Sequence, residues 1–78
     1  MTTFPVQLTS VSDIKAFVDA ASRLDCDVDV MCGRYLVDGK SIMGLFSIDV
    51  SEPIQVQIQG SQAQADIFKG AIQKFLVK

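Results

Sequence analysis

The chain has 78 residues, of which 49% are apolar and 21% charged, and its net charge is −2 at neutral pH. This length predicts one domain over residues 1–78, because each half of a divided chain would be too small to bury a core. Lys and Arg are scattered, which argues against the basic stripe of a nucleic-acid-binding protein. No apolar run approaches the ~20 residues that span a bilayer, and the N-terminal residues lack the pattern of a secretion signal. We therefore expect a cytoplasmic protein that binds neither nucleic acid nor membrane.

The two cysteines, Cys26 and Cys32, fall in one predicted strand. At ~3.3 Å per residue their Cα atoms lie ~20 Å apart, far beyond the ~7 Å limit for a disulfide. Free thiols are typical of a cytosolic protein, and we interpret both as small core or turn residues. The sequence contains no histidine, so we expect no zinc site, and nothing in it indicates another metal or cofactor.

Hydrophobic periodicity predicts the first half of the chain as strand, helix, strand, strand. Apolar and polar residues alternate over residues 4–9, and Pro5 stands near the start, which indicates an edge strand. Ser10 followed by Asp13 is typical of a helix cap. The apolar stripe of the helix that follows comprises Val11, Ile14, Phe17, Val18, Ala21 and Leu24. Residues 26–32 alternate as a half-buried strand, Gly33 supplies a turn, and residues 34–37 return as a short strand.

The second half predicts a short helix, a strand and a final helix. Ser41 opens the apolar stretch 41–46 as a helix cap. Residues 54–59 alternate strictly between apolar side chains and glutamines, and Ser61 with Gln64 forms a capping box. The stripe of the last helix comprises Ile67, Phe68, Ala71, Ile72, Phe75 and Leu76. The fold class is therefore α+β, an open-faced sandwich of order β-α-β-β-α-β-α, whose antiparallel sheet carries the helices on one face.

This order of elements, at this length, resembles HPr, the phosphocarrier of the bacterial sugar phosphotransferase system (PTS). The segment Lys40-Ser41-Ile42-Met43-Gly44 resembles the surroundings of the family's regulatory serine. The stretch 21–28 resembles the end of the first helix and the entry to the second strand. The resemblance covers essentially the whole chain and implies the HPr fold.

The chain departs from the family pattern at the phosphorylation site. The family has a histidine followed by Ala-Arg-Pro-Ala at the start of the first helix, where this sequence reads Ser10-Val11-Ser12-Asp13-Ile14. Ser10 thus replaces the histidine, Ser12 replaces the arginine, and Asp13 adds a negative charge. A serine phosphoester is too stable for phosphoryl relay, and the guanidinium that would clamp the phosphate is missing. We therefore expect that the protein has no phosphocarrier activity, contains no catalytic residue and is not an enzyme.

The resemblance implies that Ser41 is the site modified by the HPr kinase, with Lys40, Ile42 and Met43 at the surface that meets partners. Lys40 would add a favourable charge beside the phosphate, and Ile42 with Met43 would form an adaptable apolar patch. In the simpler interpretation Ser41 is only a helix cap, and Ile42 and Met43 belong to the core. Asp25, Asp27 and Asp29 share one strand face but do not match a calcium loop.

Two hypotheses of function stay open. The first is a regulatory binding module of the phosphotransferase system or of carbon catabolite control. It would resemble a paralogue of HPr that also lacks the active histidine and binds a transcriptional repressor through its regulatory serine. The second is a divergent HPr-fold interaction or structural domain that is never phosphorylated. That version predicts a monomer or a weak homo-oligomer, with the first strand as a possible self-association edge.

Overall fold

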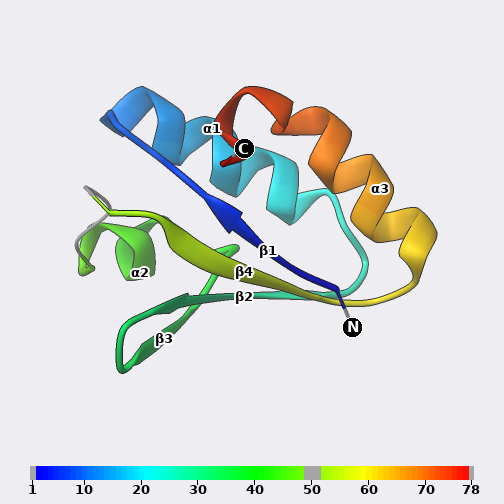
Figure 1. Cartoon of the computed structure of the whole chain (residues 1–78), viewed down its shortest axis with the longest axis horizontal. Coiled ribbons are helices and arrows are strands. Elements are labelled where there is room, and N and C mark those ends of the chain that lie inside the picture. The colour runs from blue at the N-terminus through cyan, green and yellow to red at the C-terminus, as the bar shows by residue number, and fades with distance from the viewer. Residues whose placement is uncertain (1, 49–51, 78) are drawn as a thin grey trace.

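The computed structural model describes residues 2–48 and 52–77 as one four-stranded sheet covered by helices on one side (Figure 1). The strands are β1 (Thr2–Val6), β2 (Asp27–Cys32), β3 (Tyr35–Asp38) and β4 (Ile54–Gln59). The helices are α1 (Val11–Ser22), α2 (Ile42–Phe46) and α3 (Gln62–Ala71), followed by the 3₁₀ turn η1 (Gln73–Phe75). The predicted fold class and element order are confirmed.

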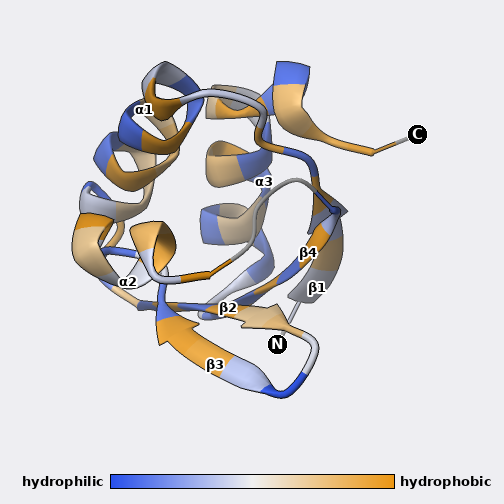
Figure 2. Ribbon diagram, turned by 90° about the vertical axis from the view of Figure 1, so that its left-hand side faces the viewer, coloured by the Kyte–Doolittle hydropathy of each residue, from blue (hydrophilic) through white to orange (hydrophobic). Residues whose placement is uncertain are grey.

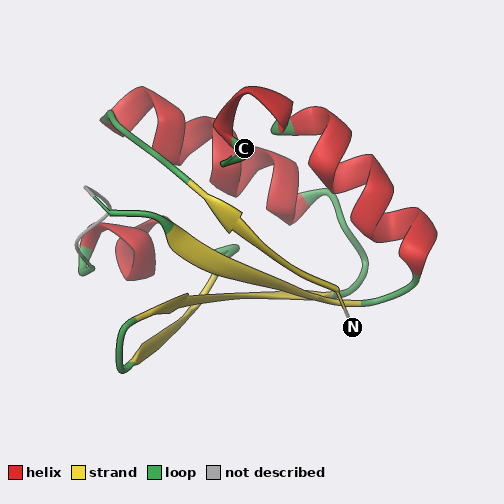
Figure 3. Ribbon diagram, viewed as in Figure 1, coloured by secondary structure: helices red, strands yellow, loops and turns green. Residues whose placement is uncertain are grey.

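The sheet has the order β1-β4-β2-β3, and every pair is antiparallel. Figure 3 shows the three helices on the same side of this sheet, with the other side open. Alternation explains that asymmetry: the inward residues of β4 are apolar, and its outward residues are glutamines. The β2–β3 hairpin turns through Gly33, whose φ of 59° suits a type II′ turn.

The core lies between the sheet and the helices (Figure 2). Phe68 of α3 is at its centre, 5.3 Å from the ring of Phe17 in edge-to-face contact and 6.3 Å from the ring of Phe4. The strands supply the rest of the inner layer, chiefly Val6, Val28, Val30, Ile54, Val56 and Ile58. This packing brings together side chains from both ends of the chain.

Three residues of the predicted helix stripes are exposed. Val11 and Ile67 are both exposed, although each recurs at helical spacing with buried neighbours. Val11 is the first residue of α1, and its side chain is exposed. Ile67 lies on the flank of α3 beside its buried neighbour Phe68, and Ala71 on the same helix is exposed too.

Several predicted boundaries are wrong by a few residues. β1 covers residues 2–6 rather than 4–9, β2 begins after Cys26, and β3 covers 35–38 rather than 34–37. The last helix ends at Ala71 instead of continuing through Leu76. The chain turns there because Leu76 bridges to Val6 of β1, which a continued helix would not allow.

Candidate functional site

The N-terminus of α1 is closed by a reciprocal cap. Ser10 Oγ accepts a hydrogen bond of 3.1 Å from the backbone N–H of Asp13. In return, Asp13 Oδ2 accepts from the backbone N–H of Thr9 at 3.0 Å and from the Thr9 hydroxyl at 2.8 Å. The cap that the sequence predicts at Ser10 is therefore present, and Thr9 is a member of it that sequence reasoning missed.

This cap places a negative charge at the start of α1. The backbone N–H of Thr9, and then its hydroxyl, lower the pKa of the Asp13 carboxyl. The carboxylate is thus ionised at neutral pH and complements the positive end of the helix dipole. Ser10 and Ser12 are both exposed beside it. A phosphoryl group brought to this helix end would meet Asp13 as a like charge.

Ser41 occupies the N-cap of α2. Its Oγ accepts a hydrogen bond of 3.1 Å from the backbone N–H of Gly44, and its own N–H donates to the carbonyl oxygen of Asp38 at 3.0 Å. The residue is half-buried. The helix cap that the sequence indicates is therefore present, and the side chain also keeps contact with solvent.

Ile42 and Met43 have different environments, although both interpretations of the sequence place them together. Met43 is 74% exposed, whereas Ile42 is half-buried and packs against the core. Phe46, three residues after Met43 and hence on the same side of α2, is also exposed. We call Met43 and Phe46 the α2 patch. The three-residue spacing between Met43 and Phe46 was the feature of the sequence that could have predicted Phe46 as part of this patch.

Lys40 does not direct its charge toward Ser41. Its Nζ donates a hydrogen bond of 2.8 Å to the carbonyl oxygen of Leu24, just after the end of α1. Its backbone N–H donates to Oδ1 of Asp38 at 2.9 Å. The expected favourable charge beside a phosphate on Ser41 is thus directed elsewhere in this structure, because a carbonyl at a helix end attracts the ammonium.

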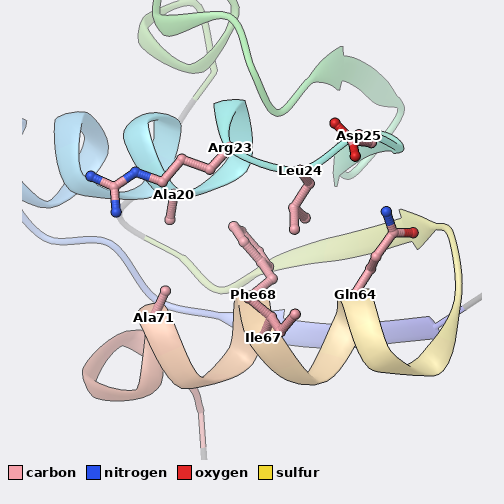
Figure 4. A pocket seen from close by; sticks show the side chains of 8 residues that line it. All are labelled: Ala20, Arg23, Leu24, Asp25, Gln64, Ile67, Phe68 and Ala71. Atoms are coloured by element: carbon pink, nitrogen blue, oxygen red, sulfur yellow. The ribbon is translucent and has the colours of Figure 1, made fainter.

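A groove of about 290 Å³ separates α1 from α3 (Figure 4). Its walls are mostly apolar, with Leu24 and Phe68 between the helices and Ile67 at the rim. The guanidinium of Arg23 pairs with Asp19 at 2.9 Å, both side chains being exposed. Nothing in this lining forms a nucleophile–base pair, so the groove offers contact area rather than chemistry.

The remaining candidate residues are the aspartates of the β2 segment and the two cysteines. Oδ2 of Asp29 accepts from Nε2 of Gln59 at 3.0 Å. Within residues 2–48 and 52–77, no three metal-ligating side chains cluster together. Cys26 and Cys32 are half-buried and packed against the core, and they form no disulfide with each other. No helix in the part of the chain that the structure describes is long and apolar enough to cross a membrane.

Comparison with known proteins identifies relatives of this arrangement. A family model described as "PTS HPr component phosphorylation site" matches residues 13–77. The phosphocarrier protein HPr from Bacillus anthracis str. Ames superposes with a TM-score of 0.73 at 23% identity, covering 95% of each chain. HPr-C-His from Thermoanaerobacter tengcongensis superposes with a TM-score of 0.71 at 21% identity, covering 97% of this chain and 100% of its own. No curated protein matches the sequence. Ser10 and Ser12 lie just outside the matched range.

Proposed function

Because this chain belongs to the PTS HPr family, we propose that it is a regulatory protein-binding module that carries no phosphoryl group on histidine. Relay needs a labile phosphoramidate, and the sequence has no histidine to form one. The positions that the family resemblance assigns to histidine and arginine hold Ser10 and Ser12. Asp13, ionised beside them, further disfavours a phosphoryl group there.

The regulatory site in this proposal is Ser41. The observation that carries it is the position of Ser41 at the α2 N-cap, with the exposed Met43 two residues on. Phosphorylation would add a charge of about −2 and three acceptor oxygens, which can take over the hydrogen bond from the Gly44 N–H. A doubly charged group would then stand beside an apolar surface, and a partner can recognise both together.

The docking surface in this proposal is the α2 patch. Met43 is the principal anchor, since a flexible exposed thioether adapts to different partners. Ile42 supports it from the half-buried side of the helix. Lys40 contributes by holding the segment before α2 against the end of α1. The partners expected for such a surface are an HPr kinase, a transcriptional repressor or other phosphotransferase-system proteins.

Intact-mass spectrometry after two separate incubations tests the proposal. One reaction contains the general phosphotransferase enzyme with phosphoenolpyruvate, and the other contains HPr kinase with ATP. We expect the mass of one phosphate to be gained only in the second reaction, and to be lost in Ser41→Ala. Ser61→Ala is the matched control, because Ser61 is also an N-cap serine accepting from the third helical residue.

Each of three results would overturn the proposal. A phosphate gained from the general enzyme would restore a carrier role at another nucleophile. Equal modification of wild type and Ser41→Ala by the kinase would remove Ser41 from the mechanism. No gain in either reaction would favour the alternative, an HPr-fold interaction domain that works without phosphorylation.

A further inference from the structure

The two edges of the sheet are protected to different extents. At the β1 edge, the backbone N–H of Val77 donates to the carbonyl oxygen of Pro5 at 3.3 Å, and the N–H of Gln7 donates to that of Phe75 at 2.8 Å. Leu76 bridges to Val6 between them. The C-terminal segment therefore pairs with the Pro5–Gln7 end of the edge that the sequence indicated as a self-association surface. The opposite edge is β3, and Figure 1 shows no other described element along its outer side.

The hydrogen-bond alternation of the β2–β3 ladder shows which backbone groups β3 presents at this edge. The N–H of Gly39 donates to the carbonyl oxygen of Val28 at 2.7 Å, continuing a ladder that pairs Val37 with Val30 and Leu36 with Met31. Hydrogen-bonded and non-hydrogen-bonded pairs alternate in an antiparallel ladder. Val37 therefore faces β2, and the N–H and carbonyl of Leu36 point away from the sheet.

The side chains of β3 are apolar and exposed. Tyr35 is 69% exposed and Leu36 is 64% exposed. Leu36 shares the open face of the sheet with its cross-strand partner Met31, which is half-buried. An edge strand with outward backbone groups and two large exposed apolar side chains is a template for another strand.

The charges that flank Leu36 identify the occupant. Arg34 precedes Leu36 by two residues and Asp38 follows it by two, and both are exposed. When two such strands pair antiparallel about a two-fold axis at Leu36, each Arg34 lies opposite an Asp38 of the other copy. Strand alternation places Leu36 and Asp38 on the open face, while Arg34, the second residue of the β2–β3 turn, stands just before the other end of the strand, so an antiparallel two-fold pairing brings opposite charges together at each end. The strand is thus complementary in charge to itself.

We propose that a second copy of this chain pairs with the β3 edge, with Leu36 at the two-fold axis, to form a continuous eight-stranded sheet. Each Leu36 exchanges two backbone hydrogen bonds with its counterpart across the axis. Leu36 and Met31 of both copies form one apolar row on the open face, and each Tyr35 covers a Val37 of the other copy. Two Arg34–Asp38 ion pairs close the interface. The proposal does not depend on Ser41 or the α2 patch.

Charge reversal with complementation tests this pairing by analytical ultracentrifugation. We expect the wild type to show concentration-dependent dimerisation. Arg34→Asp places two acidic pairs across the axis, and Asp38→Arg places two basic pairs there, so each variant alone should dimerise at least about tenfold more weakly. An equimolar mixture of the two variants restores both ion pairs and should recover dimers. Lys15→Asp, at an exposed position of α1, is the control for Arg34→Asp, because it changes the net charge in the same direction and by the same amount.

The mixture also separates a lost interface from a misfolded variant, because dimers can be recovered only if both variants are folded. A wild type that remains monomeric at every concentration up to the limit of solubility overturns the proposal. Dimers of wild-type strength in both single variants also overturn it, since the interface would then lie elsewhere. Failure of the mixture to recover dimers, with both variants folded by circular dichroism, rejects the stated register.

Discussion

The ammonium of Lys40 donates a hydrogen bond of 2.8 Å to the carbonyl oxygen of Leu24, sixteen residues earlier in the chain. This contact ties the segment before α2 to the end of α1. It is partly buried, and it gives a hydrogen-bond donor to a carbonyl just beyond the end of the helix. The position of Ser41, the next residue, therefore depends on a contact with another element.

Lys40→Met should lower the free energy of unfolding by about 1–2 kcal/mol, because a charge-assisted, partly buried hydrogen bond is lost while the aliphatic stem is kept. Urea denaturation followed by circular dichroism measures the change. Lys15→Met, at an exposed position of α1, should change stability by less than about 0.5 kcal/mol. Equal effects of the two substitutions would show that only net charge matters.

Asp13 should contribute to a pH dependence of stability. Its folded-state pKa lies below the ordinary 3.8, chiefly through the Thr9 N–H. The stabilisation is therefore present above the unfolded-state pKa and is lost as the pH falls through the folded-state pKa. Asp13→Asn should be less stable than wild type at about pH 7, and the difference should shrink on acidification below about pH 4.

Thermal unfolding across that pH range checks this expectation. Asp25→Asn, the same change at an exposed aspartate outside the cap, is the control and should follow the wild-type profile. A difference between wild type and Asp13→Asn that stays constant down to the acid limit would contradict the assignment.

Phe68→Ala should cost about 3–5 kcal/mol, because Phe68 is fully buried and contacts the rings of both Phe4 and Phe17. A chain of this size has a net stability of only about 3–5 kcal/mol, so the variant should be largely unfolded at room temperature. Near-ultraviolet and far-ultraviolet circular dichroism measure this. Phe46→Ala removes the same atoms from an exposed site, and a comparable loss there would contradict the argument.

Gly60→Ala should destabilise the protein by about 1–3 kcal/mol. A Cβ at this position would lie 2.6 Å from Sγ of Cys26, and it would also collide with Oε1 of Gln64. That Oε1 accepts the Ser61 N–H in the capping box of α3, so the box would be displaced as well. Adding Cys26→Ala should recover part of the loss because it removes the sulfur. Chemical denaturation of the single and double variants measures the coupling, and strictly additive effects would exclude this contact as the cause.

Prediction of the site from sequence succeeded where the chemistry is local. The caps at Ser10, Ser41 and Ser61 follow from a side-chain oxygen that reaches an N–H three residues on, and each is present. The separate environments of Ile42 and Met43 did not follow from sequence, since a five-residue helix shows too little periodicity to tell its buried side from its exposed side.

The sequence by itself determined the elements and the face that each strand buries, because alternation and helical spacing are properties of neighbouring residues. Ile54, Val56 and Ile58 could face only one way once the strand formed. Only the tertiary structure decided that Ile67 stays exposed, that Lys40 reaches Leu24, and that the C-terminal segment pairs with the end of β1 while β3 forms the opposite edge of the sheet. Those outcomes depend on which segments, far apart in the sequence, pack together. Local periodicity contains no information about which distant segment a given residue will contact.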